Sequence, residues 1–381
     1  MRKIAVVTGS RSDYGLQRPV MEAILRRSGM KLQVIVTGMH LLPKFGHTID
    51  EIKKDGFRID AIVPMAARGD TGAAMARGIG KGIIGMVRAF ERLKPDLLVV
   101  HGDRGEMLAA VIAASHMGIT VAHVSGGDVT RGGIDEYVRH AITKMSNIHF
   151  AETKKSAERI MRMGERKEYI FDVGSADLDA ILNSKLQEKE TFEKYGLEKK
   201  GFILVVQHPV TTQLRESPRQ MHETLEAVAA FRKPVIIIYP NSDAAGRAMI
   251  NEIETYCKTR RQFQRFRSLP RDEYLCLLKN CLVMVGNSSS GIIEAPAFKI
   301  PVVNIGIRQE GRDRSTNVLD ASPEMRKIKA AITKCLTDKK IISRVKKCKN
   351  IYGDGRTGER IARILSKIRL TPSLIQKKLT Y

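Results

Sequence analysis

Residues 97–128 read LLVVHGDRGEMLAAVIAASHMGITVAHVSGGD, and this stretch decides the fold class. Two short apolar runs, Leu97–Val100 and Thr120–Val124, flank a helical pattern from Glu106 to His116. Short, almost wholly apolar strands that alternate with helices are typical of a parallel sheet whose two faces are both covered. The stretch therefore predicts one strand–helix–strand unit of a doubly wound α/β fold.

The same alternation extends through both halves of the 381-residue chain. It is interrupted at residues 183–200 (NSKLQEKETFEKYGLEKK), a polar and charged stretch typical of a linker or hinge, and it restarts at residues 202–206. At roughly 150 residues per domain, a chain of this length holds two domains. We therefore predict two Rossmann-like, doubly wound domains, at residues 1–182 and 201–359.

The composition excludes several classes of protein. The net charge of +24 would suit a nucleic-acid-binding module, but the basic residues are spread over helical faces and only 5% of residues are aromatic. A nucleic-acid surface would need a basic stripe with interleaved aromatic side chains. The chain has no apolar run near the ~20 residues of a membrane span and no secretory signal pattern. We expect a cytoplasmic protein without nucleic-acid or membrane partners.

The cysteines argue against a disulfide or zinc framework. There are 5 of them, all in the C-terminal half, and none form a CxxC pair. Disulfide scaffolds and zinc sites both need regular cysteine spacing. We therefore expect buried, reduced cysteines and no metal site.

The loops after the strands are the candidate site, because ligands of open parallel sheets bind beyond the carboxyl ends of the strands. After the first strand, residues 8–15 (TGSRSDYG) place glycines and Arg11 before a helix, a pattern that suits a phosphate but also occurs in ordinary turns. After Leu97–Val100, Asp103 lies beside a histidine and an arginine, so it could be tuned as an acid or a base. The structural alternative for Asp103 is a cap of the next helix.

A second polar segment follows Thr120–Val124. Asp128 ends the sequence SGGD, and Asp135, Glu136 and Arg139 lie on the helix that begins near residue 134. Asp135 and Arg139 are four residues apart and share a helix face, where they could belong to a site or form an ordinary salt bridge. So dense a set of glycines and charged residues favours a functional loop.

In the second half, three strand ends carry the polar loops QHPV, PNSD and GNSSSG. The last precedes a helix, where backbone amides, serine hydroxyls and the helix dipole can hold a diphosphate or else cap the helix. A carboxylate about one turn into that helix could accept hydrogen bonds from a ribose diol. The candidate binding residues of this half are His208, Asn241, Asp243, Ser288, Ser289 and Glu294.

Together these motifs resemble one family. The chain contains RSDYG at 11–15, HGDR at 101–104, GGD at 126–128, IDEYVRHAITK at 134–144, QHPVTT at 207–212, PNSD at 240–243, GNSSSG at 286–291 and IYGDG at 351–355. This combination resembles the hydrolysing UDP-N-acetylglucosamine 2-epimerases of sialic-acid-type biosynthesis over almost the whole chain. The resemblance implies a glycosyltransferase-B-like fold with the sugar nucleotide in the cleft between two Rossmann-like domains. It also implies that residues 201–359 bind UDP and that the C-terminal helix, residues 360–381, packs back on the first domain.

The resemblance also implies the chemistry. The family removes the proton at C2 of the sugar and expels UDP from C1, which gives a 2-acetamidoglucal; water then adds and N-acetylmannosamine is released. This sequence needs an acid, a base and stabilisation of the leaving diphosphate. It needs no hydride transfer and no obligatory metal, so we expect no cofactor. Family members form dimers or tetramers, so we expect a homodimer or homotetramer.

The matched motifs assign expected roles. Asp103 is the leading acid/base residue, and Arg139 organises the sugar-facing carboxylates. Those carboxylates are Asp128, Asp135 and Glu136. The expected diphosphate ligands are Arg11, His208, Ser288 and Ser289. The other expected binding residues are Glu294, at the ribose, and Asn241 and Asp243, on the second domain's side.

Two departures from the family pattern bear on substrate and regulation. Ser125 stands where the animal enzyme has a glutamate, and serine cannot act as a comparable acid or base at neutral pH. Either the chemistry shifts to Asp103 and Asp128, or the sugar differs, as in a relative that acts on UDP-2,4-diacetamido-2,4,6-trideoxyglucose on the legionaminic acid route. The basic pair used for feedback by CMP-sialic acid falls near Asn251 and Glu254, so we expect no such inhibition.

Two other enzyme classes remain as alternatives. A non-hydrolysing UDP-N-acetylglucosamine 2-epimerase shares the fold but usually shows an HxEAG-type loop where this chain has HVSGGD at 123–128. A glycosyltransferase would need an acceptor. Release of free UDP from the sugar nucleotide alone would separate the hydrolysing epimerase from both.

Overall fold

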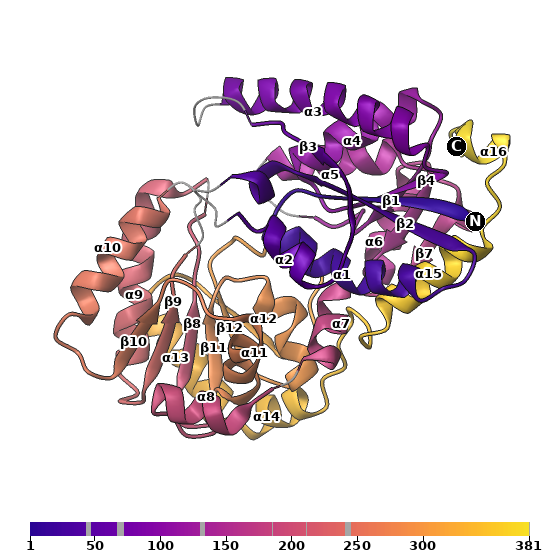
Figure 1. Cartoon of the computed structure of the whole chain (residues 1–381). Helices are drawn as coiled ribbons and strands as arrows, with labels where there is room; N and C mark the ends of the chain where they lie inside the picture. The colour runs from indigo at the N-terminus through magenta and orange to yellow at the C-terminus, as the bar shows by residue number, and fades with distance from the viewer. Residues whose placement is uncertain are drawn as a thin grey trace. The chain divides into compact units, whose positions relative to one another are not determined.

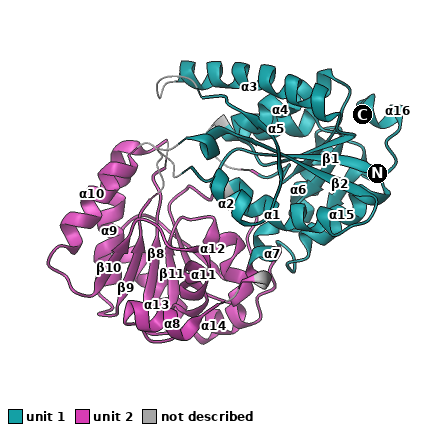
Figure 2. Cartoon of the chain, in the orientation of Figure 1, with its two compact units in different colours: residues 1–128, 134–180, 352–381 teal, residues 129–133, 181–351 magenta. Residues whose placement is uncertain are grey.

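The computed structural model describes residues 1–42, 47–66, 72–129, 134–184, 186–210, 212–240 and 245–380. The chain divides into two compact units, which Figure 2 colours separately. Unit 1 comprises residues 1–128, 134–180 and 352–381, and unit 2 comprises residues 129–133 and 181–351. Each unit contains one parallel sheet flanked by helices (Figure 1).

Unit 1 is built on a 7-stranded parallel sheet with the strand order β3-β2-β1-β4-β5-β6-β7. Its strands are β1 (Arg2–Thr8), β2 (Met30–Thr37), β3 (Ile59–Val63), β4 (Leu97–His101), β5 (Thr120–Val124), β6 (Ile148–Ala151) and β7 (Ile170–Asp172). Its α-helices are α1 (Arg11–Leu25), α2 (Ile49–Lys54), α3 (Gly72–Leu93), α4 (Gly105–His116), α5 (Ile134–Met145), α6 (Lys154–Arg162), α7 (Ala176–Asn183), α15 (Thr357–Lys367) and α16 (Pro372–Ile375). Short 3-10 turns are η1 (Gly38–Leu41) and η3 (Lys167–Tyr169).

Different helices cover the two faces of this sheet, because side chains alternate along each strand. In β1, Ile4 and Val6 pack with α1, α2 and α15 on one face, whereas Ala5 and Val7 pack with α3, α4 and α5 on the other. All four side chains are fully buried. This double burial explains why the strands read as continuous apolar runs, and the predicted doubly wound α/β class is confirmed.

Unit 2 repeats the plan with a 6-stranded parallel sheet in the order β10-β9-β8-β11-β12-β13. Its strands are β8 (Ile203–Val206), β9 (Val235–Ile238), β10 (Phe263–Phe266), β11 (Val283–Gly286), β12 (Val302–Ile305) and β13 (Val318–Ala321). Its α-helices are α8 (Glu188–Tyr195), α9 (Ser217–Ala229), α10 (Gly246–Cys257), α11 (Arg271–Asn280), α12 (Ser290–Ile293), α13 (Met325–Thr337) and α14 (Lys339–Lys346). Short 3-10 turns are η4 (Leu214–Glu216) and η5 (Ala295–Phe298).

The charged stretch at residues 183–200 contains helix α8. Tyr195 and Leu197 are buried in the core of unit 2, and the Tyr195 ring lies edge-on to Phe266 with 5.1 Å between centroids. The stretch therefore folds into unit 2 through a few apolar side chains, while its charged residues give it the composition of a linker.

The C-terminal segment belongs to unit 1 from Tyr352 onward, eight residues before residue 360, where the sequence-based division begins this segment. Helix α15 packs against α1 at Gly358, where a Cβ would lie 2.5 Å from the Pro19 carbonyl oxygen. The Asp179 carboxylate accepts hydrogen bonds from the backbone amides of Thr357 (2.8 Å) and Gly358 (2.7 Å). A carboxylate at the amino end of a helix is stabilising, so Asp179 holds α15 in place.

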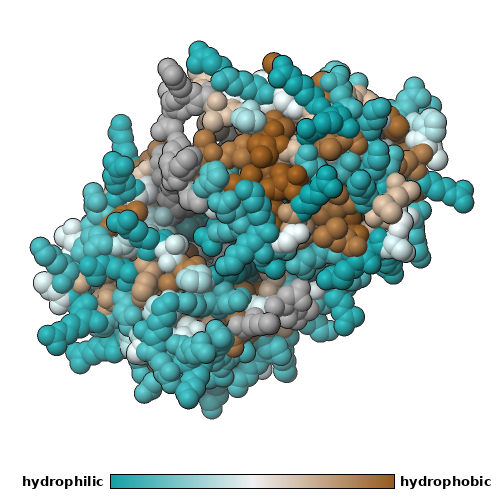
Figure 3. All heavy atoms as spheres, in the orientation of Figure 1, coloured by the Kyte–Doolittle hydropathy of each residue, from teal (hydrophilic) through white to brown (hydrophobic). Residues whose placement is uncertain are grey.

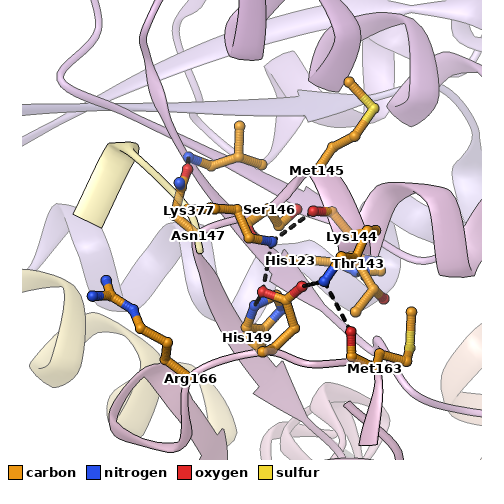
Figure 4. Close-up of polar contacts among 12 residues, drawn as sticks. His123, Thr143, Lys144, Met145, Ser146, Asn147, His149, Met163, Arg166 and Lys377 are labelled. Atoms are coloured by element: carbon orange, nitrogen blue, oxygen red, sulfur yellow. Dashed lines mark hydrogen bonds and ion pairs between the residues drawn. The ribbon is translucent and has the colours of Figure 1, made fainter. Parts of the chain in front are cut away.

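The tail beyond α15 is anchored by Lys377 (Figure 4). Its ammonium donates to the backbone oxygens of Lys144 and Ser146, each at 2.6 Å. It also lies 2.5 Å from the carboxylate of Glu165, which is 3% exposed and accepts from Lys144 Nζ (2.8 Å) and His149 Nε2 (3.1 Å). The cation thus satisfies carbonyls at the carboxyl end of α5 and a buried carboxylate together.

One face of unit 1 carries an exposed apolar groove of about 570 Å³ between β3 and α3. Ile62 is 54% exposed and Ile84 is 58% exposed, and both line the groove together with Lys81 and Arg88. Figure 3 shows hydrophobic residues gathered over this part of the surface.

Within the described chain, no helix has the combination of length and apolar character that crossing a membrane requires.

Each sheet reverses its strand order once, between β1 and β4 in unit 1 and between β8 and β11 in unit 2. Ligands of such sheets bind outside the carboxyl ends of the strands at this switch point. In unit 1, Arg11 begins helix α1 after β1 and Asp103 lies in the loop after β4; in unit 2, the loops after β8 and β11 carry His208 and Ser288. The topology therefore places predicted site residues at the switch point of both units.

Candidate active site

A buried guanidinium gathers several predicted residues of unit 1. Arg139, on α5 and 4% exposed, donates to the carboxylate of Asp103 just beyond β4. Its Nη1 also donates to Glu136 Oε2 and to the backbone oxygen of Asp128, each at 3.0 Å. Because guanidinium is planar and always charged, it orients these acceptors rigidly. The carboxylate of Asp103 is thus held in place by an ion pair with Arg139 on α5.

Asp128 faces inward. Its Oδ1 accepts from Ser156 Oγ on α6 at 2.6 Å, and the residue is 5% exposed. The preceding Gly127 has φ 75° and packs so closely that a Cβ would lie 2.3 Å from the Ser156 carbonyl oxygen. Only glycine combines this φ with this approach. The SGGD turn is therefore seated on the start of α6.

The first turn of α5 carries the other two carboxylates. Glu136 accepts from Arg139 through one oxygen and lies 3.0 Å from His140 Nε2 through the other. Asp135 is exposed. Asp103 and Asp128, two of the partners of Arg139 described above, lie in the loops after β4 and β5, so the bonds of this residue reach beyond its own helix.

Four residues near this cluster were not singled out as site residues from the sequence. Ser125 Oγ lies 2.9 Å from His101 Nε2 and donates to Glu152 Oε1 at 2.6 Å. Ser175 Oγ donates to the same carboxylate oxygen at 3.1 Å. Burial lowers the pKa of His101 to about 4. Glu152 directly follows β6, so the strand-end rule that selected Asp103 also applied to it.

Hydrogen bonds within the loop after β1 involve its own backbone amides. The amides of Gly9 and Ser10 donate to the Asp13 carboxylate at 2.9 and 2.6 Å, and Ser10 caps α1 in a capping box with Asp13. These amides are thus occupied by a side chain of the same loop. Arg11 is 61% exposed in its side chain and lies 3.2 Å from Glu51.

In unit 2, a reciprocal pair of hydrogen bonds joins the ends of β8 and β11. The His208 amide donates to Asn287 Oδ1 at 2.7 Å, and Asn287 Nδ2 donates to the His208 carbonyl at 2.9 Å. Gly286 permits the approach, since a Cβ there would lie 2.1 Å from the Val206 oxygen. Burial, with a smaller effect of Arg308, lowers the pKa of His208 to about 3, so its imidazole is neutral near pH 7.

The serine-rich turn leads into a polar network around Glu294, which is 3% exposed. The Glu294 carboxylate accepts from Arg271 and from Ser290 Oγ. Ser288 Oγ accepts from the Ser290 amide at 3.3 Å, and Ser289 precedes the four-residue helix α12 as its N-cap residue. The predicted residues Asn241 and Asp243 lie outside the described residues.

Among the residues that the structure describes, no group of three or more His, Cys, Asp or Glu side chains is arranged to hold a metal ion. In unit 1 the switch point carries Arg139 bonded to the carboxylates of Asp103 and Glu136, and in unit 2 it carries the neutral His208. Such a set can bind an anionic ligand and transfer protons.

Two Rossmann-like units, each with polar residues at its switch point, define a glycosyltransferase-B-like α/β enzyme. The fold matches a solved structure of UDP-GlcNAc 2-epimerase from Neisseria meningitidis bound to UDP-GlcNAc, with a TM-score of 0.83, 17% identity, and coverage of 96% of this chain and 100% of that one. The UDP-N-acetylglucosamine 2-epimerase family model matches residues 22–366. The chain belongs to this family and is a UDP-sugar 2-epimerase.

Two relatives indicate the range of substrates within the family. A UDP-N,N'-diacetylbacillosamine 2-epimerase (hydrolyzing) from Legionella pneumophila is 40% identical over 379 residues, which cover 99% of both chains. A UDP-N-acetylglucosamine 2-epimerase from Neisseria meningitidis is 32% identical over 333 residues, which cover 87% of both chains. The predicted family is therefore confirmed.

Proposed function

We propose that the protein is a hydrolysing 2-epimerase that converts a UDP-2-acetamido sugar to the free 2-epimer and UDP. The observation that carries this proposal is the buried Arg139, which gathers Asp103, Glu136 and the Asp128 carbonyl at the switch point of unit 1. The reaction removes the C2 proton, expels UDP from C1 and adds one water to the resulting 2-acetamidoglucal. The products are the epimeric sugar and UDP.

Asp103 is the proposed acid/base residue because it is both fixed and accessible. Its carboxylate is held by Arg139, yet its side chain is 25% exposed, and so is that of Glu136. Glu136 and its neighbour Asp135 are the proposed sugar-facing carboxylates. Asp128 contributes to the same site by holding the turn through Ser156 and by presenting its carbonyl to Arg139.

The proposed nucleotide-binding residues belong to unit 2, except Arg11 at the start of α1. His208 is a neutral donor to phosphate, since protonating it requires a pH near 3. The Glu294 carboxylate, which accepts from Arg271 and Ser290, is the proposed acceptor for the ribose hydroxyls. The remaining proposed nucleotide-binding residues are Arg11, Asn241, Asp243, Ser288 and Ser289.

Two UDP-sugars are the candidate substrates. The relative at 40% identity supports UDP-N,N'-diacetylbacillosamine, which is UDP-2,4-diacetamido-2,4,6-trideoxyglucose, and we propose it as the substrate. This reverses the order expected from sequence, where UDP-N-acetylglucosamine came first. The relative at 32% identity supports UDP-N-acetylglucosamine as the second candidate.

We also propose that the enzyme acts in the cytoplasm as a homodimer or homotetramer, as the family resemblance implies. Sedimentation of the full chain tests the assembly. A monomer at micromolar concentration would contradict it.

NMR of the reaction in deuterated water tests the function. With each UDP-sugar alone, we expect free UDP and a free 2-epimer with one deuterium at C2, and faster turnover of the diacetamido substrate. The Asp103→Asn variant should lose roughly 100-fold or more in kcat, as expected for loss of an acid/base group. A UDP-linked epimer would identify a non-hydrolysing enzyme, and turnover that requires an acceptor would identify a transferase.

A further inference from the structure

Glu152 is a buried carboxylate that joins three loops at the carboxyl edge of the unit 1 sheet. It follows β6 directly and is 4% exposed. Its Oε1 accepts from Ser125, in the loop after β5, at 2.6 Å and from Ser175, in the loop after β7, at 3.1 Å. Carboxylates are seldom buried unless they are paired or hydrogen-bonded.

The hydrogen bonds of Ser125 determine the direction of a chain of donors. A serine hydroxyl has one hydrogen, and that of Ser125 is donated to Glu152 Oε1. The hydroxyl oxygen is then left as an acceptor for His101 Nε2, 2.9 Å away. His101 must therefore carry its proton on Nε2. Its Nδ1 is buried and has no hydrogen-bond partner within the described part of the chain, which agrees with an unprotonated nitrogen.

Two members of this hydrogen-bond chain, His101 and Ser125, are linked to Asp103. His101 ends β4 two residues before Asp103. Ser125 has φ 66°, unusual for a residue other than glycine, and begins the turn to Asp128, whose carbonyl accepts from Arg139. Arg139 in turn holds the Asp103 carboxylate. The positive φ of Ser125 is costly for a residue other than glycine, so it persists only where the surrounding contacts stabilise it.

We propose that Glu152 is a positioning residue of the candidate active site, which acts through Ser125 to fix His101 as the Nε2–H tautomer and to hold the turn before Asp128. Because burial keeps His101 neutral near pH 7, the position of its single proton is set by this hydrogen-bond chain. The kinetic consequence rests on the proposed epimerase activity, but the tautomer does not.

The tautomer is measured directly by nitrogen NMR of the full chain labelled with ¹⁵N-histidine, with the His101 signal assigned by its loss in His101→Gln. We expect the Nε2–H pattern in the wild type and a mixed pattern in Ser125→Ala, which removes the link between His101 and Glu152. A wild-type signal of the Nδ1–H form would overturn the proposal. This measurement is independent of turnover.

The kinetic arm uses a double-mutant cycle. Glu152→Gln and Ser125→Ala should each lower kcat about tenfold with KM within about twofold, and the double variant should be no worse than Ser125→Ala, because residues that act as one unit are not additive. The matched control is Glu165→Gln, since Glu165 is 3% exposed in the same unit but follows α6 and bonds to His149 near the start of β6. It should lower stability without changing kcat.

Additive losses in the cycle, or an effect of Glu152→Gln confined to stability as in the control, would overturn the proposal. If the wild type turns over neither UDP-sugar, the proposed function fails, and the NMR result still decides the hydrogen-bond chain.

Discussion

Arg139 on α5 donates to the carboxylate of Asp103 beyond β4, 36 residues away in sequence, and Arg139 is 4% exposed. The contact links the two polar loops of unit 1 that sequence patterns selected independently. The Arg139 guanidinium also donates to Glu136 and to the Asp128 carbonyl, so one buried cation organises much of the candidate site.

Replacing Arg139 by lysine should lower the activity strongly. Arg139→Lys keeps the charge but cannot reach several acceptors in one plane. We expect kcat/KM for UDP release to fall roughly 100-fold. Arg18→Lys, in an exposed pair with Glu22 at 2.9 Å, is the control and should retain full activity. A loss of less than threefold in Arg139→Lys would count against the organising role.

The turn at Gly127 offers a test of backbone geometry. Gly127→Ala places a Cβ 2.3 Å from the Ser156 carbonyl oxygen at φ 75°, so we expect a loss of about 3 kcal/mol in unfolding free energy. Gly118→Ala has a similar φ of 68° but open space around it, and should cost only about 1 kcal/mol. Urea denaturation measures both, and equal losses would show that the close approach to α6 carries no cost.

His208 should bind UDP without titrating near neutral pH. Burial, with Arg308, lowers its pKa to about 3, so the imidazole is neutral between pH 6 and 8. By calorimetry, His208→Ala should weaken UDP binding about tenfold, the size of one lost hydrogen bond to a charged group. The ratio of wild-type to variant affinity should stay constant over this range, since the titration of UDP itself cancels. A ratio that rises toward pH 6 would show a protonated histidine at the phosphate. His222→Ala, exposed on α9, is the control.

Glu165 should contribute to acid sensitivity. Burial alone would raise its pKa, but hydrogen bonds from His149, Lys144 and Lys377 outweigh burial and lower the pKa from 4.5 to about 2. Its stabilisation is therefore complete above about pH 4.5 and is lost as the pH falls toward 2. The difference in Tm between wild type and Glu165→Gln should shrink from pH 6 to pH 3.5.

The tail anchor provides the companion variant. Lys377→Met removes the cation from the Glu165 carboxylate and the α5 carbonyls and should cost about 2 kcal/mol at pH 7. Glu168→Gln, whose side chain is 61% exposed, should change neither Tm nor its pH dependence. A Tm difference for Glu165→Gln that stays constant with pH would contradict the lowered pKa.

The candidate site was only partly predictable. The strand-end rule selected Asp103, Asp128 and His208 as candidates, because parallel strands bring their carboxyl ends to one edge. It did not single out Glu152, which obeys the same rule but stands in a sequence, AETKKS, that reads like the start of an ordinary helix. In the loop after β1, the sequence did not show that the Asp13 carboxylate accepts from the amides of Gly9 and Ser10.

The order of residues along the chain determined the fold class, the strand ends and the family, because alternating apolar runs and local motifs are properties of neighbouring residues. Only the tertiary structure decided which side chains form hydrogen bonds with one another. The Nε2–H direction at His101, the reach of Arg139 to Asp103 and the burial of Glu152 between two serines depend on distances between different strands. Such distances follow from sheet order and helix packing, which are set by the whole core and not by any single stretch.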